Sequence, residues 1–191
     1  WGYNLAATFS SGAFFAYLGG APYVGAEVFG LRPSELGVYF GAPAIGYFVG
    51  NWISGKYSER FGINNMILWG AALCAFGMLT QLLVFAAGAQ TALIFFAFMT
   101  FVGLGNGMVI PNATSGMLSV RPQLAGTASG LGGAMMLGGG AALSALAGAA
   151  LGTGATAFPL IYIMCGTSIA SVAACLFVRW RDAQLAMRAA E

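Results

Sequence analysis

Residues 65–87 read NMILWGAALCAFGMLTQLLVFAA, an apolar stretch without a charged residue. A helix needs roughly 20 apolar residues to cross the hydrocarbon core of a bilayer. The chain has 191 residues, 59% hydrophobic and 6% charged, which leaves little polar surface to face water. We therefore expect an all-α integral membrane protein, a six-helix bundle over residues 1–179 with a cytoplasmic tail over 180–191. The predicted spans lie near residues 3–29, 34–55, 65–87, 91–118, 124–151 and 157–178.

The positions of the cations predict how the spans are oriented. If every span crosses, Arg32 lies on one side of the membrane and all other cations lie on the opposite side. These others are Lys56, Arg60, Arg121, Arg179, Arg181 and Arg188. An excess of lysine and arginine beside the spans marks the cytoplasmic side. Both termini are therefore predicted to be cytoplasmic.

The composition argues against several classes of function. No basic patch with interleaved aromatic residues is present, so a nucleic-acid partner is not expected. The sequence has no histidine, and its three cysteines lack the spacing of a metal site, so we expect neither a metal nor a cofactor. A serine–histidine intramembrane protease is excluded, and an aspartyl protease needs two membrane aspartates, whereas Asp182 is the one aspartate. We therefore expect that the protein is not an enzyme, and a non-catalytic membrane scaffold stays open as an alternative.

Glycines four residues apart recur along the predicted spans. This spacing lets helix backbones approach closely in lipid. We expect it to serve packing within the bundle, although pairing of two copies into a twelve-helix unit stays open as an alternative. The pairs are Gly37 and Gly41, Gly46 and Gly50, Gly103 and Gly107, Gly126 and Gly130, and Gly148 and Gly152.

A short motif lies between the second and third predicted spans, where residues 55–62 read GKYSERFG. It resembles the loop signature found between the second and third helices of each half of major facilitator superfamily transporters. Gly55 is expected to let the second helix pack tightly, and Gly62 to permit a tight turn. The resemblance implies that Glu59 and Arg60 tie the loop to neighbouring helix ends and bias one access state. The alternative is a solvated charged turn that fixes topology.

A narrower resemblance concerns three further segments. RPQLAGTASG at 121–130 is similar to the start of the eleventh helix of the Bcr/CflA drug-efflux group. FAYLGGAPYV at 15–24 is similar to that group's seventh helix, and Tyr39-Phe40 to its eighth. Together they resemble the C-terminal six helices of a twelve-helix transporter. Because a span begins almost at Trp1, we expect a piece of a longer chain.

The resemblance implies secondary active transport, by alternating access, in the bacterial inner membrane. The expected activity is proton-coupled multidrug efflux of small lipophilic or cationic compounds. The expected partners are a small-molecule substrate, protons, the lipid bilayer and the missing N-terminal half-domain. The acids that couple protons in this group mostly lie in that half, so this piece alone is expected to lack coupled transport. A carrier of a sugar, an amino acid or another metabolite is the alternative.

Candidate functional residues follow from polarity and from the resemblance. Glu27 is the one acid available within a predicted span, which makes it a candidate for proton coupling, although it lies close to the outer end of its helix and is expected to reach water. In the family the first, second, fourth and fifth helices of this half line the central cavity. The candidate substrate contacts, each also a candidate for helix packing, are Asn4, Phe14, Tyr17, Tyr39, Tyr47, Asn51, Asn106, Asn112 and Met135 or Met136. Asn112 is alternatively expected to cap a carbonyl freed by the Pro111 kink.

Overall fold

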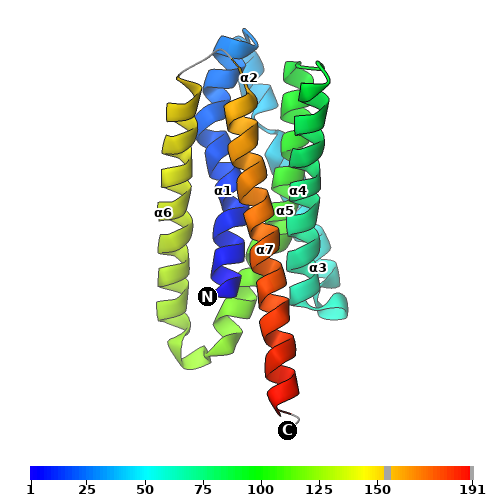
Figure 1. Cartoon of the computed structure of the whole chain (residues 1–191), viewed down its shortest axis with the longest axis vertical. Coiled ribbons are helices and arrows are strands. Elements are labelled where there is room, and N and C mark those ends of the chain that lie inside the picture. Colours follow the sequence, from blue (N-terminus) through cyan, green and yellow to red (C-terminus); the bar gives the residue numbers. More distant parts are fainter. Residues whose placement is uncertain (153–155, 190–191) are drawn as a thin grey trace.

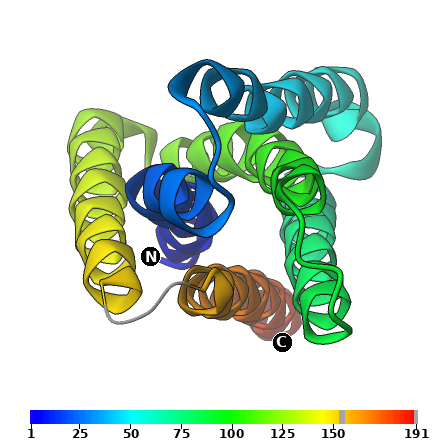
Figure 2. The same ribbon diagram turned by 90° about the horizontal axis from the view of Figure 1, so that it is seen from above.

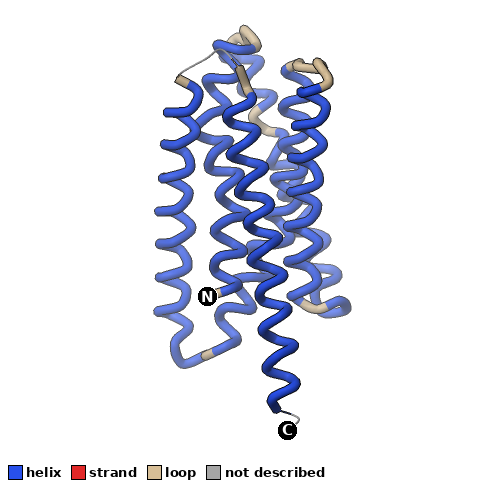
Figure 3. Tube along the Cα trace, in the orientation of Figure 1, coloured by secondary structure: helices blue, strands red, loops and turns tan. Residues whose placement is uncertain are grey.

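The computed structural model describes residues 1–152 and 156–189. The described residues form helices joined by short turns, with no strand among them (Figures 1 and 3), which confirms the all-α prediction. The elements are α1 Gly2–Tyr23, a π-helix Val24–Val28, α2 Pro33–Tyr39, α3 Ala42–Phe61, α4 Ile63–Ala86, α5 Ala92–Val120, a 3-10 turn Pro122–Leu124, α6 Ala125–Leu151 and α7 Phe158–Ala189.

The six long helices pack as a four-helix ring with two flanking helices. α1 contacts α5 and α7, and α4 also contacts both α5 and α7, so these four close a ring. α3 packs on the outside of α5, and α6 packs on the outside of α1 (Figure 2). The ring contains the core, in which Phe95, Phe96 and Met99 of α5 are fully buried.

Two helix boundaries differ from the predicted spans. The second predicted span is interrupted at Phe40-Gly41, between α2 and α3. Pro43 explains the interruption, because it has no backbone N–H to continue a helix from α2 and instead occupies the first turn of α3. At the other end, α7 continues through the predicted tail to Ala189, while residues 190–191 lie outside the described part of the chain.

Four of the described helices are long and apolar enough to cross a membrane: Ile63–Ala86, Ala92–Val120, Pro122–Leu151 and Phe158–Gln184. They correspond to the last four predicted spans. α1 is not among these four, and α2 and α3 divide the second predicted span. The crossing of these first two spans stays a prediction.

Glycine lets α3 and α5 meet backbone to backbone. A Cβ on Gly46 would overlap the carbonyl oxygen of Thr100, and one on Gly103 would overlap that of Pro43. The packing role of the pairs Gly46–Gly50 and Gly103–Gly107 is thus confirmed. It is wrong, within the described residues, for the other three pairs, at which an added Cβ would meet nothing within 4 Å or only a backbone carbonyl oxygen three or four residues earlier in the chain.

Polar side chains join three helices at the end of the bundle near the N-terminus. The Tyr3 hydroxyl donates to Asn64 Oδ1 at 2.7 Å, and Asn64 Nδ2 donates to Asp182 Oδ2 at 2.6 Å. At the opposite end, Arg32 and Glu35 form an ion pair at the start of α2. The Arg32 backbone N–H also donates to Glu35 Oε2 at 2.9 Å, so this carboxylate caps the helix.

Candidate functional site

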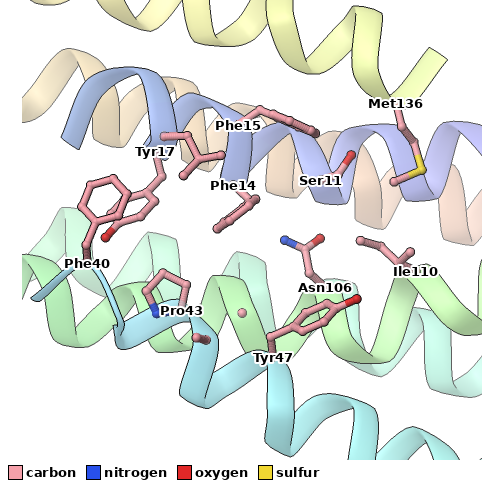
Figure 4. A pocket seen from close by; sticks show the side chains of 13 residues that line it. Ser11, Phe14, Phe15, Tyr17, Phe40, Pro43, Tyr47, Asn106, Ile110 and Met136 are labelled. Carbon is pink, nitrogen blue, oxygen red and sulfur yellow. The ribbon is translucent and has the colours of Figure 1, made fainter. Parts of the chain in front are cut away.

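A cavity of about 400 Å³ lies where α1 and α5 meet, between the flanking helices α3 and α6 (Figure 4). On α1, α3 and α5 the lining residues repeat at helical spacing and therefore share one face of each helix, whereas α6 contributes one residue. The lining residues are Ser11, Phe14, Phe15, Tyr17 and Leu18 on α1, Phe40, Pro43, Ala44 and Tyr47 on α2–α3, Gly103, Asn106 and Ile110 on α5, and Met136 on α6.

Most of the lining is aromatic or aliphatic. The rings of Tyr17 and Phe40 lie 4.9 Å apart between centroids, and the ring of Phe14 stacks beside Tyr17 at 6.3 Å. Tyr47 faces them from α3 and is 43% exposed. None of the lining residues is charged. Such a surface suits a compact, mainly apolar molecule, because rings and thioethers adapt to varied shapes.

Asn106 is the carboxamide of this cavity, and its side chain is 3% exposed. Its Oδ1 accepts a hydrogen bond from the Ser10 hydroxyl on α1 at 2.8 Å. Ser11, the other small polar residue of the lining, donates to the carbonyl oxygen of Thr8 in its own helix at 3.0 Å. The cavity therefore combines a large apolar wall with few polar groups.

Five of the predicted substrate contacts lie in this cavity: Phe14, Tyr17, Tyr47, Asn106 and Met136. Three others lie outside its lining. The ring of Tyr39 stacks on Phe96 at 5.2 Å, and Asn51 Nδ2 donates to the carbonyl oxygen of Tyr47 in its own helix at 2.8 Å. Asn112 Nδ2 donates to Ser54 Oγ at 2.6 Å and to the Met108 carbonyl oxygen at 2.8 Å. The carbonyl that Pro111 leaves without a backbone donor is that of Gly107, four residues before it, so the predicted capping is not the bond that forms.

Asn4 and Met135 also lie outside the lining of the main cavity. They contact each other, with Asn4 Nδ2 placed 2.9 Å from the Met135 sulfur. Asn4 lines a second, smaller cavity of about 140 Å³ between α1, α5 and α6. Its Oδ1 is buried and has no hydrogen-bond partner among the described residues. Met136 lines both cavities and so lies between them.

The GKYSERFG motif forms the last two turns of α3 and the Gly62 turn that leads into α4. Gly62 has φ 81° and ψ 148°, a conformation that glycine adopts far more readily than other residues, and the tight turn expected there is confirmed. The expectation for Gly55 is wrong for this part of the protein, because no described atom lies within 4 Å of a Cβ added there. Glu59 and Arg60 are exposed in the last turn of α3, and the Arg60 guanidinium lies over the ring of Phe61 at 5.3 Å.

Glu27 lies in the π-helix that follows α1, and it is exposed at that end of the bundle. Glu27 is not among the residues that line the main cavity. The lining residues that sequence reasoning missed include Phe15, Leu18, Phe40 and Ile110. Helical spacing provides the signal for them, since each lies three, four or seven residues from another lining position on its own helix segment.

Comparisons with known proteins agree with this architecture. Multidrug resistance protein D of Escherichia coli is 31% identical over 157 residues, which cover 75% of this chain and 38% of that protein. The bicyclomycin resistance protein homolog of Haemophilus influenzae is 28% identical over 185 residues, covering 95% and 45%. The uncharacterized MFS-type transporter YdgK of Bacillus subtilis is 26% identical over 171 residues, covering 88% and 41%. No solved structure matches the chain.

The fold and these relatives define an integral membrane protein of the major facilitator type, in the Bcr/CflA-like drug-efflux group. The chain spans about two fifths of the length of the curated relatives it matches. It belongs to the PUCC protein family, whose match covers residues 20–181.

Proposed function

We propose that this chain is the C-terminal half of a transporter that exports small, mainly apolar or cationic compounds by alternating access, with protons entering in exchange. The observation that carries the proposal is the main cavity, which is apolar, uncharged and large enough for a small drug. The names of two relatives, which refer to resistance against drugs, support efflux rather than uptake.

The exposed faces of the two flanking helices support a second half. α3 presents Ile45, Phe48 and Trp52 on its surface, and α6 presents Leu131 and Leu137, all more than two fifths exposed. The main cavity lies between these two helices. We propose that the N-terminal half-domain of the same protein contacts α3 and α6 and closes the cavity. We also propose that both termini of this chain lie in the cytoplasm, because the excess of lysine and arginine lies on their side of the predicted spans.

Tyr47 and Tyr162 offer a matched pair for the test. Tyr47 lines the cavity from α3, whereas Tyr162 is 58% exposed on α7, outside the cavity. Both rings are largely accessible, so replacing either by alanine removes little packing. Loss of one aromatic contact to a ligand costs about 0.5–1.5 kcal/mol, or about two- to tenfold in affinity.

The experiment uses energised inverted vesicles from cells that express the full-length protein. A panel of drugs is added and proton release from the lumen is followed with a pH-sensitive dye. We expect drug-evoked proton release, with the half-saturating drug concentration raised by Tyr47→Ala and unchanged by Tyr162→Ala. A response to no drug, together with uptake of a sugar or an amino acid, would retain the fold and reject efflux.

We further propose that the GKYSERFG loop biases the access state, as the resemblance implies. Lys56 and Arg60 are both exposed cations of this loop, so they carry the same charge near the same surface. Arg60→Ala should weaken drug-evoked proton release without changing the half-saturating drug concentration, while Lys56→Ala should leave both near the wild-type values. Equal effects of the two substitutions would favour the solvated, topology-fixing turn.

A further inference from the structure

In the structure, the Ser10–Asn106 pair engages the oxygen end of the Asn106 amide beside the main cavity. A carboxamide has a donor end and an acceptor end, and neighbouring hydrogen bonds decide its orientation. A serine hydroxyl on α1 donates to Asn106 Oδ1, and Ser10 itself is 1% exposed. The oxygen is therefore engaged, and the amide nitrogen remains for the cavity.

Figure 4 shows the amide nitrogen of Asn106 directed into the cavity on the side of Phe14. The hydrogen bonds of the described residues use the oxygen of this amide and not its nitrogen. The nitrogen is also not among the buried polar atoms that lack a partner, so it is open to the cavity. A ligand acceptor placed there would accept a hydrogen bond that an apolar ligand cannot, so the donor discriminates between ligands.

The lining provides no compensating negative charge. All its residues are uncharged, and the N–H end of an amide carries partial positive charge. A cationic group beside this nitrogen would be repelled, whereas a carbonyl, amide or ether oxygen would accept a hydrogen bond. The aromatic wall of Phe14, Tyr17 and Phe40 would hold the apolar remainder of such a molecule.

We infer that this half of the cavity selects neutral, mainly apolar compounds that carry an oxygen acceptor, with Asn106 as the recognising residue and Ser10 as its positioning residue. The inference rests on the proposed function, because it assumes that the main cavity holds the substrate. It narrows the expected substrate class by disfavouring cations at this position.

Three probes test the inference by direct binding to the purified full-length protein. Benzophenone and diphenylmethane have the same two rings and differ in the ketone oxygen, while tetraphenylphosphonium is a cation without a hydrogen-bond donor or acceptor. The readout is the ratio of the dissociation constants for benzophenone and diphenylmethane. Because the ratio is internal to each variant, partial loss of folded protein does not alter it.

Asn106→Leu should shift that ratio about three- to tenfold against benzophenone, as expected for one lost hydrogen bond. Asn106→Asp preserves the shape of the side chain but replaces the amide donor by a carboxylate. It should therefore favour a cation, and tetraphenylphosphonium should bind at least tenfold more tightly than to the wild type. Ser10→Ala frees the amide to turn and should shift the ratio in the same direction as Asn106→Leu, by a smaller factor. Ser119→Ala, at the far end of α5, is the matched serine control and should leave the ratio unchanged.

Two outcomes would overturn the inference in distinguishable ways. If both neutral probes bind but the ratio is the same in the wild type, Asn106→Leu and Asn106→Asp, the donor has no role in selection and the proposed function is unaffected. If none of the three probes binds to the wild-type protein, the main cavity is not a site for apolar drugs, and the proposed function fails together with the inference.

Discussion

Replacing Gly107 by alanine probes the contact between α3 and α5. A Cβ at this position would lie 2.6 Å from the Tyr47 carbonyl oxygen and 2.8 Å from the Asn51 nitrogen. Ordinary contact begins at about 3.4 Å, so the helices must separate by about 0.8 Å. Both neighbours are backbone atoms, and neither can rotate away as a side chain would.

The steric overlap at Gly107 should lower the free energy of unfolding, and a glycine without neighbouring atoms provides the control. Overpacking of this kind costs about 1–3 kcal/mol. Gly166 on α7 is exposed, and no described atom lies within 4 Å of a Cβ added there, so Gly166→Ala should gain up to about 1 kcal/mol from helix propensity. Gly107 also lies in a helix interior and shares this gain, so the two variants should differ by the overlap alone, about 1–3 kcal/mol, or about 2–12 °C in Tm.

The measurement uses the cysteines already in the chain. Cys74, Cys165 and Cys175 are buried and reduced, so a thiol-reactive fluorophore reports their exposure when the protein unfolds in detergent. Gly107→Ala should release the signal at a lower temperature than the wild type, and Gly166→Ala at the same or a higher temperature. If both variants melted together, the backbone contact between α3 and α5 would not exist in the protein as purified.

Three further substitutions test other features by the same melting assay or by transport. Gly62→Ala forces a side chain into a conformation reserved for glycine and should lower stability by about 1–3 kcal/mol; an unchanged Tm would contradict the turn. Gln81 is fully buried, donates to the Phe95 carbonyl oxygen at 3.2 Å, and has an Oε1 without a partner among the described residues. Gln81→Leu should therefore raise Tm by a few degrees, because it removes an unsatisfied acceptor, and a lower Tm would indicate a hidden partner. Glu27→Gln should leave drug-evoked proton release intact because Glu27 is exposed, and abolished release would make it a coupling acid.

Much of the fold could be predicted because the membrane restricts the choices. The length and apolarity of residues 65–87 predict one helix, and α4 at Ile63–Ala86 nearly coincides with it. The interruption at Phe40-Gly41 was missed because hydropathy averages over a window and does not register a single proline. A proline inside an apolar stretch indicates a break such as that at Pro43, but whether it bends a helix or starts a new one depends on the packing of the turn before it.

The candidate site was predictable at the level of helices but not of individual side chains. Phe14, Tyr17, Tyr47 and Asn106 line the cavity as expected, whereas Tyr39 is turned toward the core ring of Phe96. Sequence spacing assigns residues to a common face, but it does not fix which face is turned toward which neighbour. That rotation is set by contacts distant in the chain, such as the backbone approach of α3 to α5.

The contacts of α6 predict that its first half moves more freely than its second half. Near its second half, a Cβ on Gly19 would lie 2.7 Å from the Ser144 carbonyl oxygen, so α1 and α6 meet there backbone to backbone. In the first half, a Cβ on Gly132 would meet the flexible Met117 side chain at 2.9 Å, and Cβ atoms on Gly126, Gly130 and Gly133 would meet no described atom within 4 Å, so α6 has side-chain contacts there but no close backbone approach at its glycines. Close backbone contact permits little repacking, whereas contact through flexible side chains leaves two arrangements possible.

Spin labels provide the test of this asymmetry in the full-length protein. Leu131 and Leu146 are exposed on the two halves of α6, and Leu83 on α4 is a common exposed reference. We expect a bound ligand to change the distance from Leu83 to Leu131 more than the distance from Leu83 to Leu146. Equal changes would mean that α6 moves as a rigid body. The close contact between Gly19 and Ser144 would then not be the pivot about which α6 tilts. Because Met136 lies between the two cavities and near the middle of α6, tilting about that pivot would change the connection between them.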